Sequence, residues 1–390
     1  MFADHLPAYR QRYALGAAEE RAAADILRCR SASLGGHHGQ CSACGFVRPA
    51  YNSCRNRHCP KCQGLRQARW VNRRMERVLP THYFHVVFTL PAELHSIVRA
   101  NRALVFDLLL RSAAAALLDL GRDPKWLGQA ADLAVTTVLH TWTRDLRFHP
   151  HVHCIVSGGG LVTDGSRWLP ASRDFLFPVH VLGALFRGKV LAAIAEAHRD
   201  GQLALPATER GRVGRRRLDR LYDKSWVVYA KRPFGGPAQV HRYLGRYTHR
   251  VAISNARLVA ADGAGVTFRT RGQDTVTLAG VDFIRRFLDH VLPKGFVKIR
   301  HYGLLASGNV GPRLGRARAL LQAPAGELPV PADGEPSPDD QVDWPALLLA
   351  LTGIDVRLCP CCQRPTLRRL PLGAPPSAAR APPRLEEAAA

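Results

Sequence analysis

Buried β-strands are the clearest structural pattern along this chain of 390 residues. Apolar runs rich in β-branched and aromatic residues, bounded by turn residues, are typical of short strands. The segments that fit are residues 83–89 (YFHVVFT), 132–140 (DLAVTTVLH), 151–157 (HVHCIVS), 226–230 (WVVYA), 266–269 and 275–278. Arg271-Gly272-Gln273 separates the last two and indicates a hairpin, and Gly158-Gly159-Gly160 is expected to end the third strand.

Helical periodicity covers much of the remaining chain. It predicts helices over residues 63–78, over a long stretch that ends near Gly121, and over residues 179–198. A further helix is predicted over residues 236–250, where Pro237 is acceptable in the first turn. Short strands interleaved with helices predict the α+β class.

Changes in composition divide the chain into three regions. Residues 1–80 hold six of the ten cysteines and end in a basic helical run, so they form one predicted domain. Residues 81–305 hold the strands listed above and form a second, larger domain. Residues 306–390 contain an acidic, Pro-rich linker at 323–343, a short apolar helix, a Cys-Pro-Cys-Cys cluster and a Pro/Ala tail that is expected to be disordered.

The charge balance points to a polyanionic partner. The chain carries 55 Lys and Arg against 31 Asp and Glu, a formal net charge of +24, whereas 46% hydrophobic residues exclude wholesale disorder. No signal-peptide pattern and no apolar run of membrane-spanning length is visible, which predicts a cytoplasmic protein. The partner is therefore predicted to be nucleic acid, and a bacterial-type protein of this kind would associate with the nucleoid when bound to DNA.

Two cysteine pairs indicate a structural zinc site. Cys41-x-x-Cys44 and Cys59-x-x-Cys62 are separated by fourteen residues, and two such turns complete a four-sulfur shell around one tetrahedral ion. Further candidate ligands lie nearby and either substitute in that site or make a second one: Cys54 and His58 in the loop, and Cys29 with His37 or His38 upstream. The alternative for these residues is a structural role, as buried thiols or satisfied histidines.

The same segment is strongly basic. Nine Lys and Arg stand against one Glu between Cys41 and Pro80, which predicts a DNA-binding unit as well as a zinc-binding one. A merely solvated basic helix is the alternative interpretation.

A histidine-rich strand carries the candidate catalytic chemistry. Because side chains alternate along a strand, His151 and His153 share one face, while Val152 and Cys154 enter the core behind it. Two imidazoles on neighbouring positions of one face can hold a divalent ion, Mg²⁺ or Mn²⁺, and leave its other positions open to a scissile phosphate. The alternative is the polar face of an exposed strand.

Two tyrosines lie four residues apart on the predicted helix 236–250. Tyr243 and Tyr247 are neighbours on one helical face, which by itself is typical of core packing. Three basic side chains on the same turns favour a place beside DNA phosphates: Arg242, Arg246 and Arg250. A phenol has an ordinary pKa near 10, and nearby cations favour the phenolate needed to attack a phosphate.

The order of these motifs resembles a known family. A His-hydrophobic-His strand followed by Tyr-x-x-x-Tyr on a helix is similar to the HUH endonuclease superfamily. Five segments narrow the resemblance to the two-tyrosine transposases of the insertion-sequence ninety-one family: residues 54–63 (CRNRHCPKCQ), 86–91 (VVFTLP), 140–142 (HTW), 149–156 (HPHVHCIV) and 243–255 (YLGRYTHRVAISN). The similarity runs from about Cys29 to about Leu305.

The resemblance implies a zinc-binding N-terminal domain and a catalytic domain with a central antiparallel sheet and flanking helices. It maps the metal histidines onto His151 and His153, and the nucleophiles onto Tyr243 and Tyr247. It implies a transposase that nicks and joins single-stranded DNA through 5′-phosphotyrosine links, moving an insertion sequence by a rolling-circle route without a three-carboxylate core.

Some points stay open at this stage. Related enzymes often add a third polar ligand, for which His149, Asp145, His140 and His85 are candidates, each also suited to a structural role. The cluster at residues 359–362 offers half a cysteine shell, so it either takes ligands from a partner or binds nothing. A rolling-circle replication initiator or relaxase, and a non-catalytic zinc-dependent DNA-binding regulator, are the alternative functions.

Overall fold

The computed structural model describes the chain except for short stretches of the first eighty residues and several longer segments. The described residues are 1–64, 67, 70, 74, 76–205, 215–231, 252–263, 265–322, 345–346, 348–349 and 353–372. The predicted helix 236–250, the predicted linker 323–343 and the tail from Gly373 lie outside them, and residues 63–78 are described only in part.

A six-stranded antiparallel sheet forms the centre of the fold. Its strands follow the order β11-β4-β5-β3-β7, and β6 pairs with the far end of β5. The strands are β3 (Tyr83–Thr89), β4 (Ala131–Trp142), β5 (Phe148–Val162), β6 (Trp168–Pro170), β7 (Val228–Lys231) and β11 (Ile299–Gly303). The α+β class with a central antiparallel sheet is therefore confirmed.

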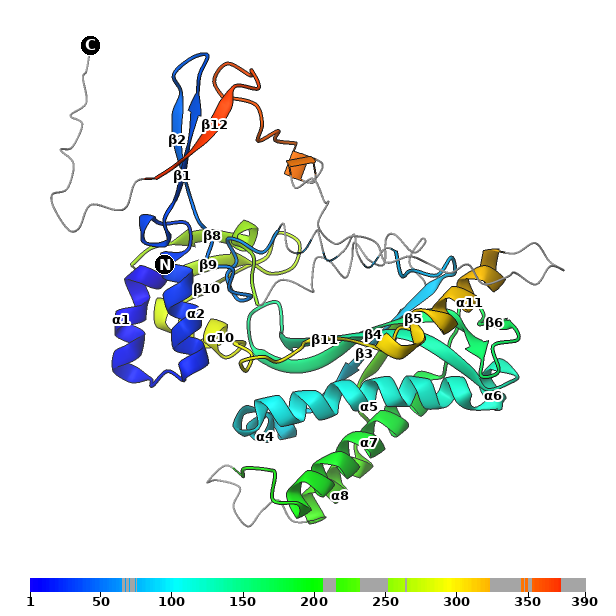
Figure 1. Ribbon diagram of the computed structural model, residues 1–390. Coiled ribbons are helices and arrows are strands. Elements are labelled where there is room, and N and C mark those ends of the chain that lie inside the picture. The colour runs from blue at the N-terminus through cyan, green and yellow to red at the C-terminus, as the bar shows by residue number, and fades with distance from the viewer. Residues whose placement is uncertain are drawn as a thin grey trace.

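Long apolar helices cover one face of this sheet (Figure 1). Alternate residues of β5, among them Val152 and Cys154, enter a core shared with Phe106 and Phe186 from the two longest helices. Each of these helices has 21 residues. Both carry apolar side chains at helical spacing, so each packs one side against the sheet. The helices on this side are α4 (His95–Ala100), α5 (Arg102–Arg122), α6 (Pro124–Leu127), α7 (Val179–Arg199) and α8 (Arg215–Asp223).

On the opposite face of the sheet, the described residues place a helix over one end. There α11 (Pro312–Gln322) packs Leu314 and Ala317 against Tyr83, Val138 and Ile155. The other end of the same face carries histidines in place of apolar side chains, so this face is divided into a packed part and a polar part.

A second core joins the N-terminus to the segment after residue 251. Phe2 and Leu6 of the first helix pack with Phe283 and Phe287, and Phe2 meets Phe287 edge to face at 5.3 Å. The elements of this core are α1 (Phe2–Arg12), α2 (Ala17–Arg28), β8 (Leu258–Ala261), β9 (Val266–Arg269), β10 (Thr275–Leu278) and α10 (Gly280–Leu288).

A third sheet joins the two ends of the chain. It has the order β12-β1-β2 and consists of β1 (Gly36–Cys41), β2 (Val47–Tyr51) and β12 (Leu367–Pro371), which extend from the rest of the fold in Figure 1. The described residues also form four single-turn 3₁₀ segments: Ala32–Leu34, Ala92–Leu94, Asn255–Arg257 and Ser307–Asn309.

Most predicted elements lie where the pattern puts them. The strand at residues 83–89 and the hairpin at 266–269 and 275–278 match to the residue, and the helix predicted at 179–198 extends one residue further. One prediction is wrong: β5 does not end at the glycines but continues to Val162. These glycines allow β6 to lie close to β5. A Cβ on Gly159, whose φ is +141°, would collide with the Leu169 carbonyl of β6.

None of the described helices is long and apolar enough to cross a lipid bilayer.

Candidate metal centres

Three histidines converge on the polar part of the central sheet. One ring nitrogen each of His140, His151 and His153 lies within 4.8 Å of the other two. His151 and His153 share a face of β5, as predicted, and His140 reaches the same face from β4. Three imidazole nitrogens at this separation suit one divalent transition ion with further positions left open.

Strand register brings His140 to the other two. His140 lies directly opposite His151 in the β4–β5 ladder, and Val138 lies opposite His153. A tight turn sets this register: the Leu146 N–H donates to the Thr143 carbonyl at 3.0 Å, and Leu146 adopts a φ of +64° with its side chain fully buried.

Neighbouring groups fix the orientation of two rings. The His151 Nδ1–H donates to the His149 carbonyl at 2.6 Å, which leaves Nε2 with a lone pair for a metal. His153 Nδ1 lies 2.7 Å from His85 Nε2, and the two rings stack with centroids 5.0 Å apart. In the tautomer in which His153 Nε2 can bind a metal, its Nδ1–H donates to His85.

Burial keeps these imidazoles neutral. It lowers the pKa of His151 to about 4, and it holds the pKa of His153 well below the ordinary value. The pKa of His85 is lowered by burial to about 4 in the same way. A neutral imidazole is the form that binds a metal, so no proton has to be removed at neutral pH.

The other candidates for a third ligand have different partners. The Asp145 carboxylate accepts from Thr143 Oγ1 at 2.5 Å and pairs with Arg147 at 2.6 Å within the β4–β5 turn. The carbonyl of His149 orients His151, and the ring of His85 contacts His153. Of the four, only His140 belongs to the cluster of metal-binding geometry among the described residues.

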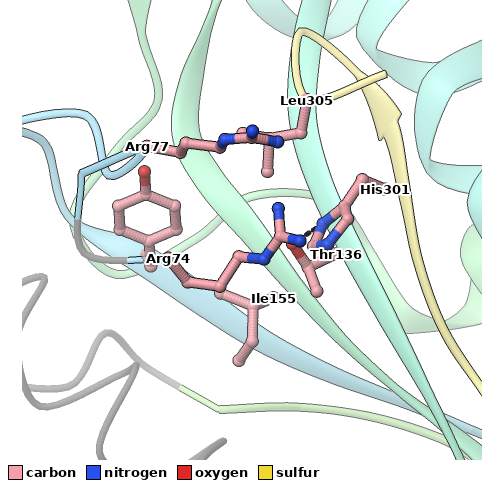
Figure 2. A pocket seen from close by; sticks show the side chains of 7 residues that line it. Arg74, Arg77, Thr136, Ile155, His301 and Leu305 are labelled. Atoms are coloured by element: carbon pink, nitrogen blue, oxygen red, sulfur yellow. Dashed lines mark hydrogen bonds between the residues drawn. The ribbon is translucent and has the colours of Figure 1, made fainter. Parts of the chain in front are cut away.

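A basic pocket lies on the same face of the sheet. Figure 2 shows the Arg74 guanidinium pointing toward His301 and Thr136, with the Arg77 side chain on the same pocket. Thr136 Oγ1 and His301 Nδ1 are 2.9 Å apart. Thr136 precedes His140 by four residues on β4, and Ile155 follows His153 by two on β5, so along the strands the pocket is about 13 Å from His140 and about 7 Å from His153. Sequence reasoning did not single out this pocket.

Four cysteines of the N-terminal region form a compact cluster. Sγ atoms of Cys29, Cys54, Cys59 and Cys62 all lie within 4.8 Å of one another, with 3.8 Å between those of Cys54 and Cys62. A tetrahedral zinc ion with bonds of about 2.3 Å separates its sulfur ligands by about 3.8 Å. The cluster therefore fits a structural zinc ion.

The other N-terminal pair belongs to a different cluster. Cys41 and Cys44 lie with Cys359 and Cys362 within the same 4.8 Å limit. The predicted single shell of Cys41, Cys44, Cys59 and Cys62 is therefore wrong. The reason is the hairpin β1–β2, which places the turn after Cys41 at one end and the loop with the other cysteines at the opposite end, about 17 Å away.

His58 is not part of either cysteine cluster. Its Nε2 accepts from the Leu292 N–H at 3.0 Å, and its Nδ1 lies 3.0 Å from Asn56 Oδ1. Burial lowers the pKa of His58 to about 3, so the ring is a neutral link between the cysteine loop and the segment after α10. Of the two interpretations of His58, zinc ligand or structural histidine, these contacts favour the structural one.

The predicted nucleophiles and their neighbouring arginines lie outside the described residues. These are Tyr243, Tyr247, Arg242, Arg246 and Arg250, within residues 232–251. Their roles stay predictions.

Comparison with known proteins finds two family matches along the chain. The family described as "Putative transposase" (Y2_Tnp) matches residues 134–311, which include β4, β5 and the three histidines. The family described as "Transposase zinc-binding domain" (Zn_Tnp_IS91) matches residues 1–90, which include the cluster of Cys29, Cys54, Cys59 and Cys62. No solved structure matches the chain.

Two curated proteins are similar over most of their length. The "Putative transposase y4qJ" of Sinorhizobium fredii is 43% identical over 368 residues, which is 92% of this chain and 90% of that protein. The "Transposase for insertion sequence element IS801" of Pseudomonas savastanoi pv. phaseolicola is 29% identical over 326 residues, 78% of this chain and 74% of that protein.

These matches define the chain as a transposase, an enzyme that processes DNA, with a zinc-binding domain at its N-terminal end. The chain belongs to the IS91 family of insertion-sequence transposases. DNA is therefore its partner, and the zinc-binding match together with the cysteine clusters supports structural zinc.

Proposed function

We propose that this transposase cuts and rejoins single-stranded DNA through 5′-phosphotyrosine links, and so drives rolling-circle transposition of an insertion sequence. The observation that carries the proposal is the convergence of one ring nitrogen each from His140, His151 and His153 on the polar part of a sheet face. The proposal also rests on the resemblance of the sequence to HUH enzymes, which perform this chemistry.

The three histidines are the proposed ligands of a catalytic divalent ion. When bound, the ion would polarise the scissile phosphate and stabilise the charge that develops on it. Imidazole favours first-row transition ions over Mg²⁺, so Mn²⁺ is the better fit of the two predicted ions. His85 is a positioning residue in this proposal, because its contact with His153 fixes the orientation of that ring.

The ends of residues 232–251 support a place for the tyrosines beside this site. The segment follows Lys231, which lies opposite His85 in the β3–β7 ladder. It precedes Ala252 and Ile253, which share a core with Leu146 and Trp142. The Trp142 ring stacks on His140 at 4.6 Å, so the segment begins beside the strand that carries His85 and ends in the apolar core that Trp142 borders.

Tyr243 or Tyr247 is the proposed nucleophile. Its deprotonated oxygen attacks the phosphorus, a new bond joins that oxygen to the 5′ phosphate, and the 3′ oxygen leaves and takes up a proton. The phosphate ester bond is exchanged and not hydrolysed, so the 3′ hydroxyl of a strand can later reverse the step without ATP. A second tyrosine allows one cleaved end to be held while the other cuts or accepts the next.

Basic side chains are the proposed contacts to the DNA backbone. Arg74 and Arg77 lie on the histidine-bearing face and would bind a phosphate of the same strand. Arg242, Arg246 and Arg250 are proposed to contact phosphates beside the tyrosines. Cys29, Cys54, Cys59 and Cys62 are the proposed ligands of the structural zinc in the N-terminal domain.

A denaturation-resistant adduct tests the chemistry. The protein is incubated with a labelled single-stranded element end and Mn²⁺, and the expected product is a covalent DNA–protein species. Tyr243→Phe/Tyr247→Phe should abolish it, whereas Tyr229→Phe, a matched change at an exposed tyrosine of β7, should not. An adduct that persists in the double variant would show that the nucleophiles are assigned wrongly.

Substrate choice separates the proposal from its alternatives. Cleavage of the element ends is expected; cleavage only at a plasmid or phage origin would indicate a replication initiator or relaxase. Salt-sensitive binding without cleavage under any divalent ion would indicate a non-catalytic regulator.

A further inference from the structure

We propose that Cys41, Cys44, Cys359 and Cys362 bind a second zinc ion, which fastens the C-terminal segment of the chain to its N-terminal domain. This site is separate from the cluster of Cys29, Cys54, Cys59 and Cys62. It is also independent of the proposed nicking activity, because none of its residues belongs to the histidine-bearing sheet.

The sulfur positions fit a tetrahedral ion. Cys41 Sγ lies 3.7 Å from Cys362 Sγ, and Cys44 Sγ lies 3.7 Å from Cys359 Sγ, with all four atoms within 4.8 Å of one another. The spacing expected around zinc is about 3.8 Å. Each sulfur of the first pair thus contacts one sulfur of the second pair, which is the arrangement expected when two cysteine turns share one ion.

The two turns have the same backbone structure, although they lie at opposite ends of the sequence. In the first, the Gly45 N–H donates to the Cys41 carbonyl at 3.1 Å and the Cys41 N–H donates to the Phe46 carbonyl at 2.8 Å. In the second, the Gln363 N–H donates to the Cys359 carbonyl at 2.8 Å and the Cys359 N–H donates to the Arg364 carbonyl at 2.9 Å.

The equivalent residue after each second cysteine has a left-handed backbone. Gly45 has a φ of +72°, and Gln363 has a φ of +57°. Glycine adopts this conformation at no cost, whereas glutamine does so only where its surroundings require it. Gln363 therefore completes a tight turn that brings the preceding Cys359 and Cys362 to the same side. The equivalence also explains the extra cysteine, because Cys361 corresponds to Ala43 and is exposed.

Main-chain pairing aligns the turns. β12 pairs antiparallel with β1 from Cys41 opposite Leu367 to His37 opposite Pro371, and the Ser42 N–H donates to the Thr366 carbonyl at 3.1 Å. The Thr366 hydroxyl lies 3.0 Å from Cys41 Sγ. The strand pairing and the sulfur contacts thus specify the same alignment of the two chain ends.

The sheet β12-β1-β2 has little else to stabilise it. Within the described part of the chain, none of the three apolar clusters contains a residue of 36–51 or of 353–372. Most residues of β2 and β12 are exposed, whereas Cys41 and Cys359 are buried, at 2% and 0% exposure. A sheet without an apolar core needs a cross-link or a metal ion to persist, and the buried thiols supply the ligands.

Zinc counting with paired variants tests the site. Elemental analysis of the purified full-length chain should give one zinc fewer for Cys359→Ser/Cys362→Ser than for the unmodified protein. Cys41→Ser/Cys44→Ser should lose the same single ion, and the variant that combines all four changes should also lose only one. Any ion held by the histidines cancels in these differences, and Cys361→Ser is the matched control that should lose none.

Several results would overturn the proposal. They are an unchanged zinc content in Cys359→Ser/Cys362→Ser, a loss of two ions in that variant or in the fourfold variant, and a loss in the Cys361→Ser control. A disulfide that joins any two of Cys41, Cys44, Cys359 and Cys362 in the denatured, unreduced protein would also overturn it, because those sulfurs could not then bind an ion.

Hydrogen exchange supplies a readout that does not depend on metal analysis. Backbone amides of β12 should exchange faster in Cys359→Ser/Cys362→Ser than in Cys361→Ser, whereas those of β9 should be unchanged. Equal protection of β12 in both variants would contradict a role for the ion in fastening this strand.

Discussion

The two faces of the central sheet are built by the same strands but have opposite chemical character. On β5, Val152 and Cys154 enter a core formed by helices α5 and α7, whereas His151 and His153 on the other face meet His140. Because side chains alternate with a period of two, one strand serves stability on one side and ligand binding on the other. Mutations on the two faces should therefore separate folding from activity.

The largest expected effect lies on the histidine face. His151→Ala removes one of three proposed metal ligands, so adduct formation should fall by about three orders of magnitude or more. The midpoint of thermal unfolding should change little. The measurement is the rate of adduct formation with an element end, and His149→Ala is the control, because it keeps the carbonyl that orients His151. Equal losses in both variants would contradict the assignment.

The apolar face should respond in the opposite way. Phe88 is fully buried on β3 and packs on Phe186 of α7 at 4.8 Å, so Phe88→Ala should lower the free energy of unfolding by about 3–5 kcal/mol. Chemical denaturation measures this change. At a temperature where the variant is folded, its rate per folded molecule should stay close to that of the unmodified protein. If Phe88→Ala lost activity without losing stability, the division into a stabilising face and a metal-binding face would be contradicted.

A smaller effect is expected at the residue that supports His153. His85→Gln should weaken the apparent affinity for Mn²⁺ by about 10–100-fold, because an orienting partner is changed while all three proposed ligands remain. Titration of adduct formation with Mn²⁺ measures this shift. At saturating Mn²⁺ the rate should recover, which distinguishes a positioning role from a direct one.

The smallest effect, counted per pH unit, concerns acid stability at a buried histidine that is not one of the proposed metal ligands. Burial lowers the pKa of His290 to about 4, so this ring stays neutral in the folded protein while its unfolded counterpart takes up a proton below about pH 6.5. The stability it contributes is therefore fully present above pH 6.5 and is lost as the pH falls toward 4.

Replacement of this histidine isolates its share of the acid response. His290→Gln should reduce the slope of unfolding free energy against pH by about 1.4 kcal/mol per pH unit in that window. Denaturation curves of both proteins between pH 4.5 and 7, in roughly half-unit steps, measure the difference. Equal slopes for the two proteins would show that the His290 ring takes up its proton over the same pH range in the folded and the unfolded state, which would contradict the prediction.

Local patterns predicted the strands well because each strand is encoded in its own segment. Residues 83–89 contain only apolar, aromatic, histidine and threonine side chains, and they form β3 to the residue. The shared face of His151 and His153 also followed from alternation alone. The glycines at 158–160 led to a wrong end for β5, because glycine is required both in tight turns and where another strand approaches closely.

Long-range pairing could not be predicted in the same way. His140 was one of four candidates, and only the register of β4 against β5 selects it. The cysteine pairs have identical spacing, so nothing local indicates that Cys41 and Cys44 associate with residues 315 positions away and not with the nearer pair. Such choices depend on how distant strands pair, which spacing does not encode.

The pairing of β12 with β1 cannot form until almost the whole chain has been synthesised. The first cysteine turn emerges from the ribosome early, whereas the second cysteine turn follows 315 residues later, and β12 comes after it. At bacterial-to-eukaryotic translation speeds this delay is roughly 15–60 s. During that interval the hairpin β1–β2 has an unpaired edge, and a chain that terminates early keeps it permanently.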